Sequence, residues 1–162
     1  METQYLKSGE SIIADTDVRV FTILGSCVAI MLYDPKLKLG AMSHALLPDN
    51  SFSIMERRDK NPMLYVEQGL YALMDKMIER GSLKHRLIVK IFGGSSINIC
   101  EDELCNNPRV GEKNVLKALE IIEKEGLNLA VNDTGGDTGR KLIFYPAQGV
   151  VYRKFVKKNP YE

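Results

Sequence analysis

The chain has 162 residues and a net charge of +1, with 44% hydrophobic and 27% charged residues. This length and composition are typical of one soluble globular domain, and the near-neutral charge gives no general attraction to nucleic acid or to a membrane. No apolar run approaches the roughly 20 residues of a membrane-spanning helix, and Met1-Glu2-Thr3-Gln4 does not begin a secretion signal. Three cysteines without a disulfide spacing suit a reducing compartment. We therefore expect a cytoplasmic protein with a single domain over residues 1–162.

Strands dominate the first half of the chain. Ser11-Ile12-Ile13-Ala14 is short, whereas the runs Val18 to Leu24 and Val28 to Tyr33 are apolar on both faces and predict interior strands. The segment Asp34 to Lys38 predicts a turn that contains Pro35, and Gly40 to Leu47 returns as a strand. The polar stretch from Pro48 to Lys60 is expected to be a loop over a site.

The second half alternates helices with strands. Asn61-Pro62 predicts the start of a helix that ends at Gly81, and a second helix is predicted over Gly111 to Glu125. Further strands are predicted over Leu87 to Phe92, Leu129 to Val131, Lys141 to Tyr145 and Val150 to Val156, the last two joined as a hairpin. This order favours an α+β fold, an α/β sandwich in which two long helices pack on a mixed, mostly antiparallel β-sheet system.

Cys27 lies in Leu24-Gly25-Ser26-Cys27, a tight Gly-Ser break between two apolar runs. A thiol at such a turn can present its sulfur and its backbone N–H on the same side, as a cysteine hydrolase requires. A buried cysteine is also a common small hydrophobic residue, so a structural role stays open at this point.

His44 lies within an apolar strand, where an uncommitted imidazole would cost desolvation free energy. It is either a core histidine with one backbone hydrogen bond or a general base that takes the proton of Cys27. A third group would orient the imidazole, and Thr22 is a candidate because it shares a strand face with Val20 and Leu24. An ordinary β-branched strand residue is the alternative for Thr22.

Glycines follow the strand that ends at Phe92. The run Gly93-Gly94-Ser95-Ser96 lacks the Gly-Lys-Ser/Thr ending of a phosphate loop, and predicts instead a close approach of the backbone to a substrate or to a neighbouring loop. Cys100 and Cys105 are spaced too widely for a zinc clip and have no histidine nearby. We therefore expect neither a metal nor a cofactor.

Several blocks together resemble one family, the CheD chemoreceptor glutamine deamidases. The blocks are Leu24-Gly25-Ser26-Cys27-Val28-Ala29, Gly40 to Pro48, Lys90 to Ser95, Val110 to Val115, Asn132 to Gly136 and Gly139 to Phe144, in the family's order. The resemblance covers nearly the whole chain. It implies Cys27 as nucleophile, His44 as base and Thr22 as third residue, although some members place the threonine where this chain has Phe21. The loop Pro48 to Lys60 departs from the family's Gly/Ser-rich stretch.

The resemblance also implies a reaction and its partners. It implies hydrolysis of a glutamine side-chain amide to glutamate and ammonia, through a thioester on Cys27, on the cytoplasmic helical bundle of a chemoreceptor. Ser26, Gly93, Gly94 and Ser95 are the predicted substrate-binding residues. The alternative is a regulatory binding partner of a CheC-type response-regulator phosphatase. Neither reading includes nucleic acid or membrane insertion.

Overall fold

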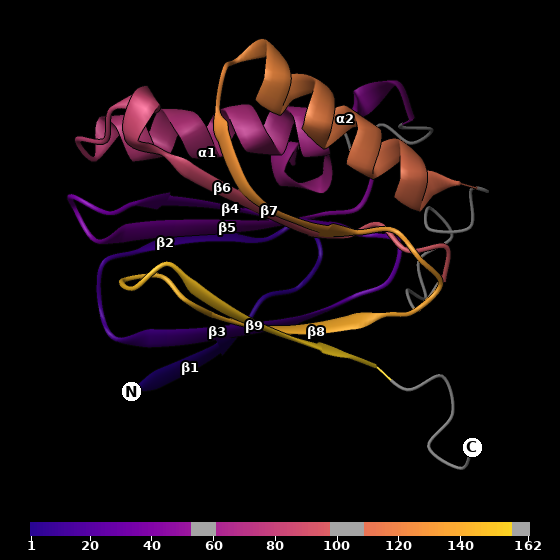
Figure 1. Ribbon diagram of the computed structural model, residues 1–162, viewed down its shortest axis with the longest axis horizontal. Helices are drawn as coiled ribbons and strands as arrows, with labels where there is room; N and C mark the ends of the chain where they lie inside the picture. Colours follow the sequence, from indigo (N-terminus) through magenta and orange to yellow (C-terminus); the bar gives the residue numbers. More distant parts are fainter. Residues whose placement is uncertain (53–60, 98–108, 157–162) are drawn as a thin grey trace.

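The computed structural model describes residues 1–52, 61–97 and 109–156. Within these residues the chain forms three layers: two helices, a five-stranded sheet beneath them, and a four-stranded sheet on the far side (Figure 1). The strands are β1 (Glu2–Tyr5), β2 (Ser11–Ala14), β3 (Val18–Leu24), β4 (Val28–Asp34), β5 (Leu39–Ala45), β6 (Ile88–Gly93), β7 (Asn128–Thr134), β8 (Arg140–Tyr145) and β9 (Val150–Phe155). The helices are α1 (Val66–Glu79) and α2 (Val110–Lys124). The predicted α+β class and layered sandwich are confirmed.

Both sheets are mixed and mostly antiparallel. The five-stranded sheet has the order β2-β5-β4-β6-β7, and only β6 and β7 pair in parallel, across the connection that contains α2. The four-stranded sheet has the order β1-β3-β8-β9, and only β1 and β3 pair in parallel. None of the helices in the described ranges is long and apolar enough to cross a bilayer.

The central strand β4 separates two buried clusters. Val28, Ile30 and Leu32 point toward the helices, whereas Ala29 and Met31 point toward the four-stranded sheet. Successive side chains of a strand point to opposite faces, so a strand that is apolar at every position must be covered on both sides. The uninterrupted apolar run in the sequence is explained by this position between the helix layer and the second sheet.

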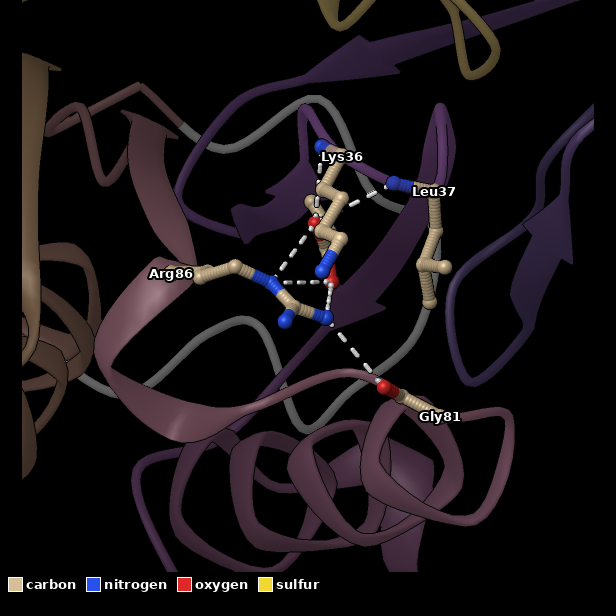
Figure 2. A network of polar contacts seen from close by, with 5 residues as sticks. Lys36, Leu37, Gly81 and Arg86 are labelled. Atoms are coloured by element: carbon tan, nitrogen blue, oxygen red, sulfur yellow. Dashed lines mark hydrogen bonds and ion pairs between the residues drawn. The ribbon is translucent and has the colours of Figure 1, made fainter.

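A buried ion pair fixes the turn between β4 and β5. Arg86 Nη2 lies 2.9 Å from Asp34 Oδ2 and donates to the carbonyl of Gly81 at 3.2 Å, beyond the end of α1 (Figure 2). Asp34 Oδ1 accepts the backbone N–H groups of Lys36 and Leu37 at 2.9 and 3.3 Å. Burial acts to raise the pKa of Asp34, but these hydrogen bonds, that of Arg86 foremost, hold it below its usual value.

Some details differ from the predictions. The strand β3 is not covered on both faces: Val18, Val20, Thr22 and Leu24 are buried, whereas Arg19 and Ile23 are exposed, because no described element packs on that side. The strand β1 was not predicted, and its single strongly apolar neighbour, Leu6, gives too little pattern to reveal it. The predicted start of the first α-helix at Asn61-Pro62 is wrong: Asn61 caps a short 3₁₀ turn, Pro62–Leu64, and α1 begins at Val66. The backbone is extended at Tyr65 because this residue bridges to Leu47 at the end of the His44 segment.

The predicted loop Pro48 to Lys60 contains a 3₁₀ turn at Asn50–Phe52, and its residues 53–60 lie outside the described ranges, as do Cys100 and Cys105.

Candidate active site

Cys27 lies where the chain passes from one sheet to the other. The strand β3 belongs to the four-stranded sheet and β4 to the five-stranded sheet, so Gly25-Ser26-Cys27 forms the crossing. All three carbonyls of this segment accept hydrogen bonds. The backbone N–H of Ser95 donates to Gly25 at 3.0 Å, and that of Gly94 donates to Cys27 at 2.8 Å. The side chain of Asn114 donates to the third carbonyl, of Ser26, at 3.0 Å. A turn anchored at every carbonyl holds its cysteine in one place.

Gly93 and Gly94 make this anchoring possible. Both have positive φ angles, 105° and 63°, which side chains other than that of glycine rarely adopt. A Cβ on Gly93 would collide with the carbonyl oxygen of Cys27, and a Cβ on Gly94 would collide with Val115 of α2. The predicted close approach of the Gly93-Gly94 backbone to a neighbouring loop is therefore confirmed, and that loop is the Cys27 turn.

Asn114 joins the Cys27 turn to the strand that carries His44. It is fully buried on α2, and its Nδ2 donates to the carbonyls of Ser26 and Leu46 at 3.0 and 3.1 Å. Leu46 lies two residues beyond His44. One amide group thereby fixes the position of the nucleophile candidate relative to that of the base candidate.

His44 projects from β5 toward the four-stranded sheet, and Thr22 projects from β3 toward the five-stranded sheet. Thr22 Oγ1 lies 2.8 Å from His44 Nδ1 and donates to the carbonyl oxygen of Leu6 at 2.6 Å. Because that carbonyl can only accept, the single hydroxyl proton of Thr22 is committed to it. Thr22 Oγ1 must then accept a proton from His44, which places the imidazole proton on Nδ1 and leaves the Nε2 lone pair available. The predicted shared, buried face of Val20, Thr22 and Leu24 is confirmed.

Burial keeps the imidazole neutral. Desolvation lowers the pKa of His44 from 6.5 to about 4, against the smaller opposing effects of the Leu6 carbonyl and the charge of Glu10. At neutral pH the ring therefore carries one proton, which the hydrogen bonds place on Nδ1. A neutral imidazole with a bare Nε2 can accept a proton from a thiol.

Cys27 and His44 line one pocket of about 420 Å³. The remaining lining residues come from the end of β1 and the segment after it, and from the end of β3: Tyr5, Lys7, Ser8, Ile23 and Gly25. The sequence did not indicate Tyr5, Lys7, Ser8 or Leu6, because β1 was not predicted and the contribution of Leu6 is a backbone carbonyl. Glu10, whose charge acts on His44, lies in the segment after β1 and was not indicated by the sequence either.

None of the predicted substrate-binding residues is among the described residues that line the pocket. Gly94 and Ser95 use their backbone N–H groups to hold the Cys27 turn, and Gly93 lies against the Cys27 carbonyl. Ser26 is buried, with no hydrogen-bond partner for its Oγ in the part of the chain that the structure describes. Their contact with a substrate stays a prediction, whereas their support of the turn is direct.

The chain matches known proteins over most of its length. Residues 46–155 match the family model described as CheD chemotactic sensory transduction. A "probable chemoreceptor glutamine deamidase CheD" of Methanococcus maripaludis (strain C6) is 36% identical over 150 residues, covering 92% of this chain and 93% of the relative. A protein of Geobacter sulfurreducens named CheD 2, with the same description, is 37% identical over 155 residues, covering 96% and 91%. A relative from Pyrococcus horikoshii is 41% identical over 138 residues, covering 84% and 81%.

The three relatives cover 84% to 96% of this chain at 36% to 41% identity. The chain belongs to the CheD family.

Proposed function

We propose that this protein is a chemoreceptor glutamine deamidase, which hydrolyses the side-chain amide of glutamine on a receptor to glutamate and ammonia. The observation that carries the proposal is the chain of contacts from the Leu6 carbonyl through Thr22 to His44 Nδ1, with Cys27 in the same pocket. It fits an oriented neutral base beside a thiol, which is the arrangement of a cysteine amidohydrolase. The names of the relatives support the substrate class.

In the proposed mechanism, the first half-reaction forms a thioester. His44 Nε2 takes the thiol proton as Cys27 Sγ attacks the carboxamide carbon, which gives a tetrahedral oxyanion. The proton on Nε2 then passes to the amide nitrogen, the C–N bond breaks, and ammonia leaves. The imidazole is neutral again, still with its proton on Nδ1.

The second half-reaction releases glutamate. Water attacks the thioester carbon while His44 Nε2 takes one of its protons. The C–S bond breaks, and the same proton returns to Cys27 Sγ. The resting thiol is restored.

We assign the stabilisation of the oxyanion to the backbone N–H of Cys27, with that of Ser26. The backbone N–H of Gly94 is a poorer candidate, because it donates to the Cys27 carbonyl at 2.8 Å. This assignment makes the geometry of the Gly25-Ser26-Cys27 turn part of catalysis, since the same turn carries the nucleophile and the donors.

The substrate site lies on the cytoplasmic helical bundle of a chemoreceptor, which places the reaction in the cytoplasm. Deamidation replaces a neutral amide with an anion and thus changes the repulsion between neighbouring helices. It also creates a carboxylate that can accept a methyl group. A glutamyl methyl ester would enter the same acyl-enzyme route, with methanol leaving in place of ammonia.

The test is incubation with a receptor cytoplasmic fragment, followed by mass spectrometry for conversion of Gln to Glu. Wild-type protein should convert specific glutamines, and Cys27→Ala and His44→Ala should abolish conversion. His85→Ala is the matched control, because His85 is exposed on the 3₁₀ turn Lys84–Arg86. Conversion that survives Cys27→Ala would refute the mechanism. Tight binding of a CheC-type phosphatase without any conversion would favour the alternative, a regulatory binding partner.

A further inference from the structure

No described helix or strand lies over the outer face of the four-stranded sheet (Figure 1). This face carries exposed apolar side chains. The helices pack on the five-stranded sheet, and the inner face of the four-stranded sheet packs against its other side. The outer face is formed by the alternate residues that point away from that core: Thr3, Tyr5, Arg19, Phe21, Ile23, Lys141, Ile143, Tyr145, Val150, Tyr152 and Lys154.

Apolar and aromatic residues form a continuous row across this outer face. The strand registers align Tyr5 with Phe21, Phe21 with Ile143, and Ile143 with Tyr152. The Tyr5 and Phe21 rings lie 5.0 Å apart, and Tyr145 meets Tyr152 edge to face at 6.0 Å. Tyr152 is 62% exposed. Exposed rings arranged in rows rather than singly are typical of interaction surfaces.

The row is continuous with the pocket. Tyr5 and Ile23 lie on the outer face and also line the pocket that contains Cys27 and His44. A partner bound along the row therefore reaches the pocket mouth without crossing another element of the described chain. This continuity links the outer face to the proposed reaction.

The charged side chains among the described residues of the outer face are all basic. Arg19, Lys141 and Lys154 are exposed on it, and no acidic side chain is among its described residues. Lys141 and Lys154 are paired neighbours, and Lys141 Nζ lies 5.9 Å from the centre of the Phe21 ring. Lys7 adds a further basic group at the pocket. The whole chain has a net charge of only +1, so this clustering is local.

We infer that the outer face of the four-stranded sheet is the docking surface for an acidic amphipathic helix of the receptor, which presents its glutamine to the pocket. This inference rests on the proposed function. Four strands about 4.8 Å apart give a row about 14 Å long, which matches about ten residues of helix. The apolar stripe of such a helix covers the aromatic row, and its acidic flanks meet the basic residues.

The test compares two matched double variants. Tyr152→Ser/Lys154→Glu removes a ring and reverses a charge at the far edge of the row, away from the pocket. Leu116→Ser/Lys76→Glu makes the same kinds of change on the exposed side of the helix layer, where Leu116 is 58% exposed. Both are measured with a cytoplasmic fragment of a chemoreceptor encoded by the same genome.

The outer-face variant should raise the KM for the fragment, and the Kd of a Cys27→Ala form, at least about tenfold. The helix-layer variant should leave both within about twofold. Alkylation of Cys27 by iodoacetamide should be equal in the two variants, which shows that the pocket itself is unchanged. Binding by the wild type should weaken with added salt, and less steeply in the variant that carries Lys154→Glu.

The outcomes separate this inference from the proposed function. Normal turnover with an unchanged KM and Kd in the outer-face variant overturns the docking surface and leaves the deamidase intact. Binding that the outer-face variant loses, without turnover by the wild type, supports the docking surface and refutes the deamidase. A wild type that neither binds nor converts the fragment overturns both. Sedimentation that shows a wild-type dimer, dissociated by Tyr152→Ser, overturns the inference because a second copy then covers the face.

Discussion

Thr22 Oγ1 and His44 Nδ1 lie 2.8 Å apart, although Thr22 belongs to the four-stranded sheet and His44 to the five-stranded sheet. The contact depends on a third group, the Leu6 carbonyl, which takes the hydroxyl proton at 2.6 Å. Without that carbonyl, the threonine could donate to Nδ1 and leave the imidazole in the opposite tautomer. The backbone carbonyl of Leu6 therefore decides which imidazole nitrogen of His44 carries the proton.

Substitution of Thr22 tests this chain of contacts. Thr22→Val keeps the shape of the side chain but removes the hydroxyl, so His44 Nδ1 keeps only its longer contact, 3.4 Å, with the Leu6 carbonyl. The imidazole is then held less firmly, and kcat should fall about 10- to 100-fold. Thr22→Ser retains the hydroxyl and should restore most of the rate. The measurement is kcat on a receptor fragment, with the fold of each variant checked by circular dichroism. Equal rates for Thr22→Val and the wild type would remove Thr22 from the mechanism.

The low pKa of His44 predicts a dependence of stability on pH. The unfolded chain binds a proton at this residue near pH 6.5, and the folded protein does so only near pH 4. Between these values the unfolded state holds more protons, so acid favours unfolding and stability falls with decreasing pH. The fall from pH 7 to pH 4 should be about 3 kcal/mol from this residue alone. Urea unfolding of the wild type and of His44→Gln checks it, since the variant should lack this part of the slope.

A single methyl group added at Gly93 should displace Cys27, the proposed nucleophile. Gly93→Ala should cost the strain of a positive φ, about 1–2 kcal/mol, plus about 1–3 kcal/mol from collision with the Cys27 carbonyl. Gly126 also has a positive φ, 64°, but a Cβ there meets nothing within 4 Å. Gly126→Ala should therefore show the strain alone. Thermal unfolding gives the stabilities, and only Gly93→Ala should also slow the alkylation of Cys27.

Substitution of Asn114 should lower both the stability of the protein and its activity. Asn114→Ala leaves the buried carbonyls of Ser26 and Leu46 without a donor, which should cost about 2–4 kcal/mol. Asn114→Asp should cost more, because a buried carboxylate oxygen would face the same two carbonyls. Urea unfolding measures both variants. If Asn114 aligns the Cys27 turn with the His44 strand, kcat at low temperature should fall even where the variant is fully folded.

The sequence predicted the elements that are long and strongly patterned. The uninterrupted apolar run of β4 indicated a strand covered on both sides, and this prediction is confirmed. The same interpretation of Val18 to Leu24 was wrong, because only alternate residues of β3 are buried. The prediction for β4 succeeds because burial directly selects the residue types on each face. The pairing of Cys27 with His44 came instead from the resemblance to the CheD family, and both residues line one pocket.

The parts of the structure that the sequence did not reveal depend on backbone contacts between residues far apart in the chain. The strand β1 exists because Glu2–Tyr5 pair with Val18–Phe21, and local pattern does not record such pairing. The hydrogen bond that fixes the His44 tautomer ends on a backbone carbonyl, which any residue at position 6 would supply. The helix start at Asn61 was misplaced because a bridge from Tyr65 to Leu47 outweighed a good local cap. In each case, the structure depends on a backbone contact between residues far apart in the sequence, and the local residue pattern does not reveal such a contact.

The passage of the chain between the sheets at Gly25-Ser26-Cys27 has a consequence for evolution and engineering. Thr22 belongs to one sheet, His44 to the other and Cys27 to the crossing between them, so the spacing between the sheets sets the distances among these three proposed active-site residues. Core residues between the sheets, such as Met31 and Met42, set that spacing although they lie outside the pocket lining. A change of volume there would alter turnover long before the protein unfolds, so variants with tuned activity should be sought in the interior of the sandwich.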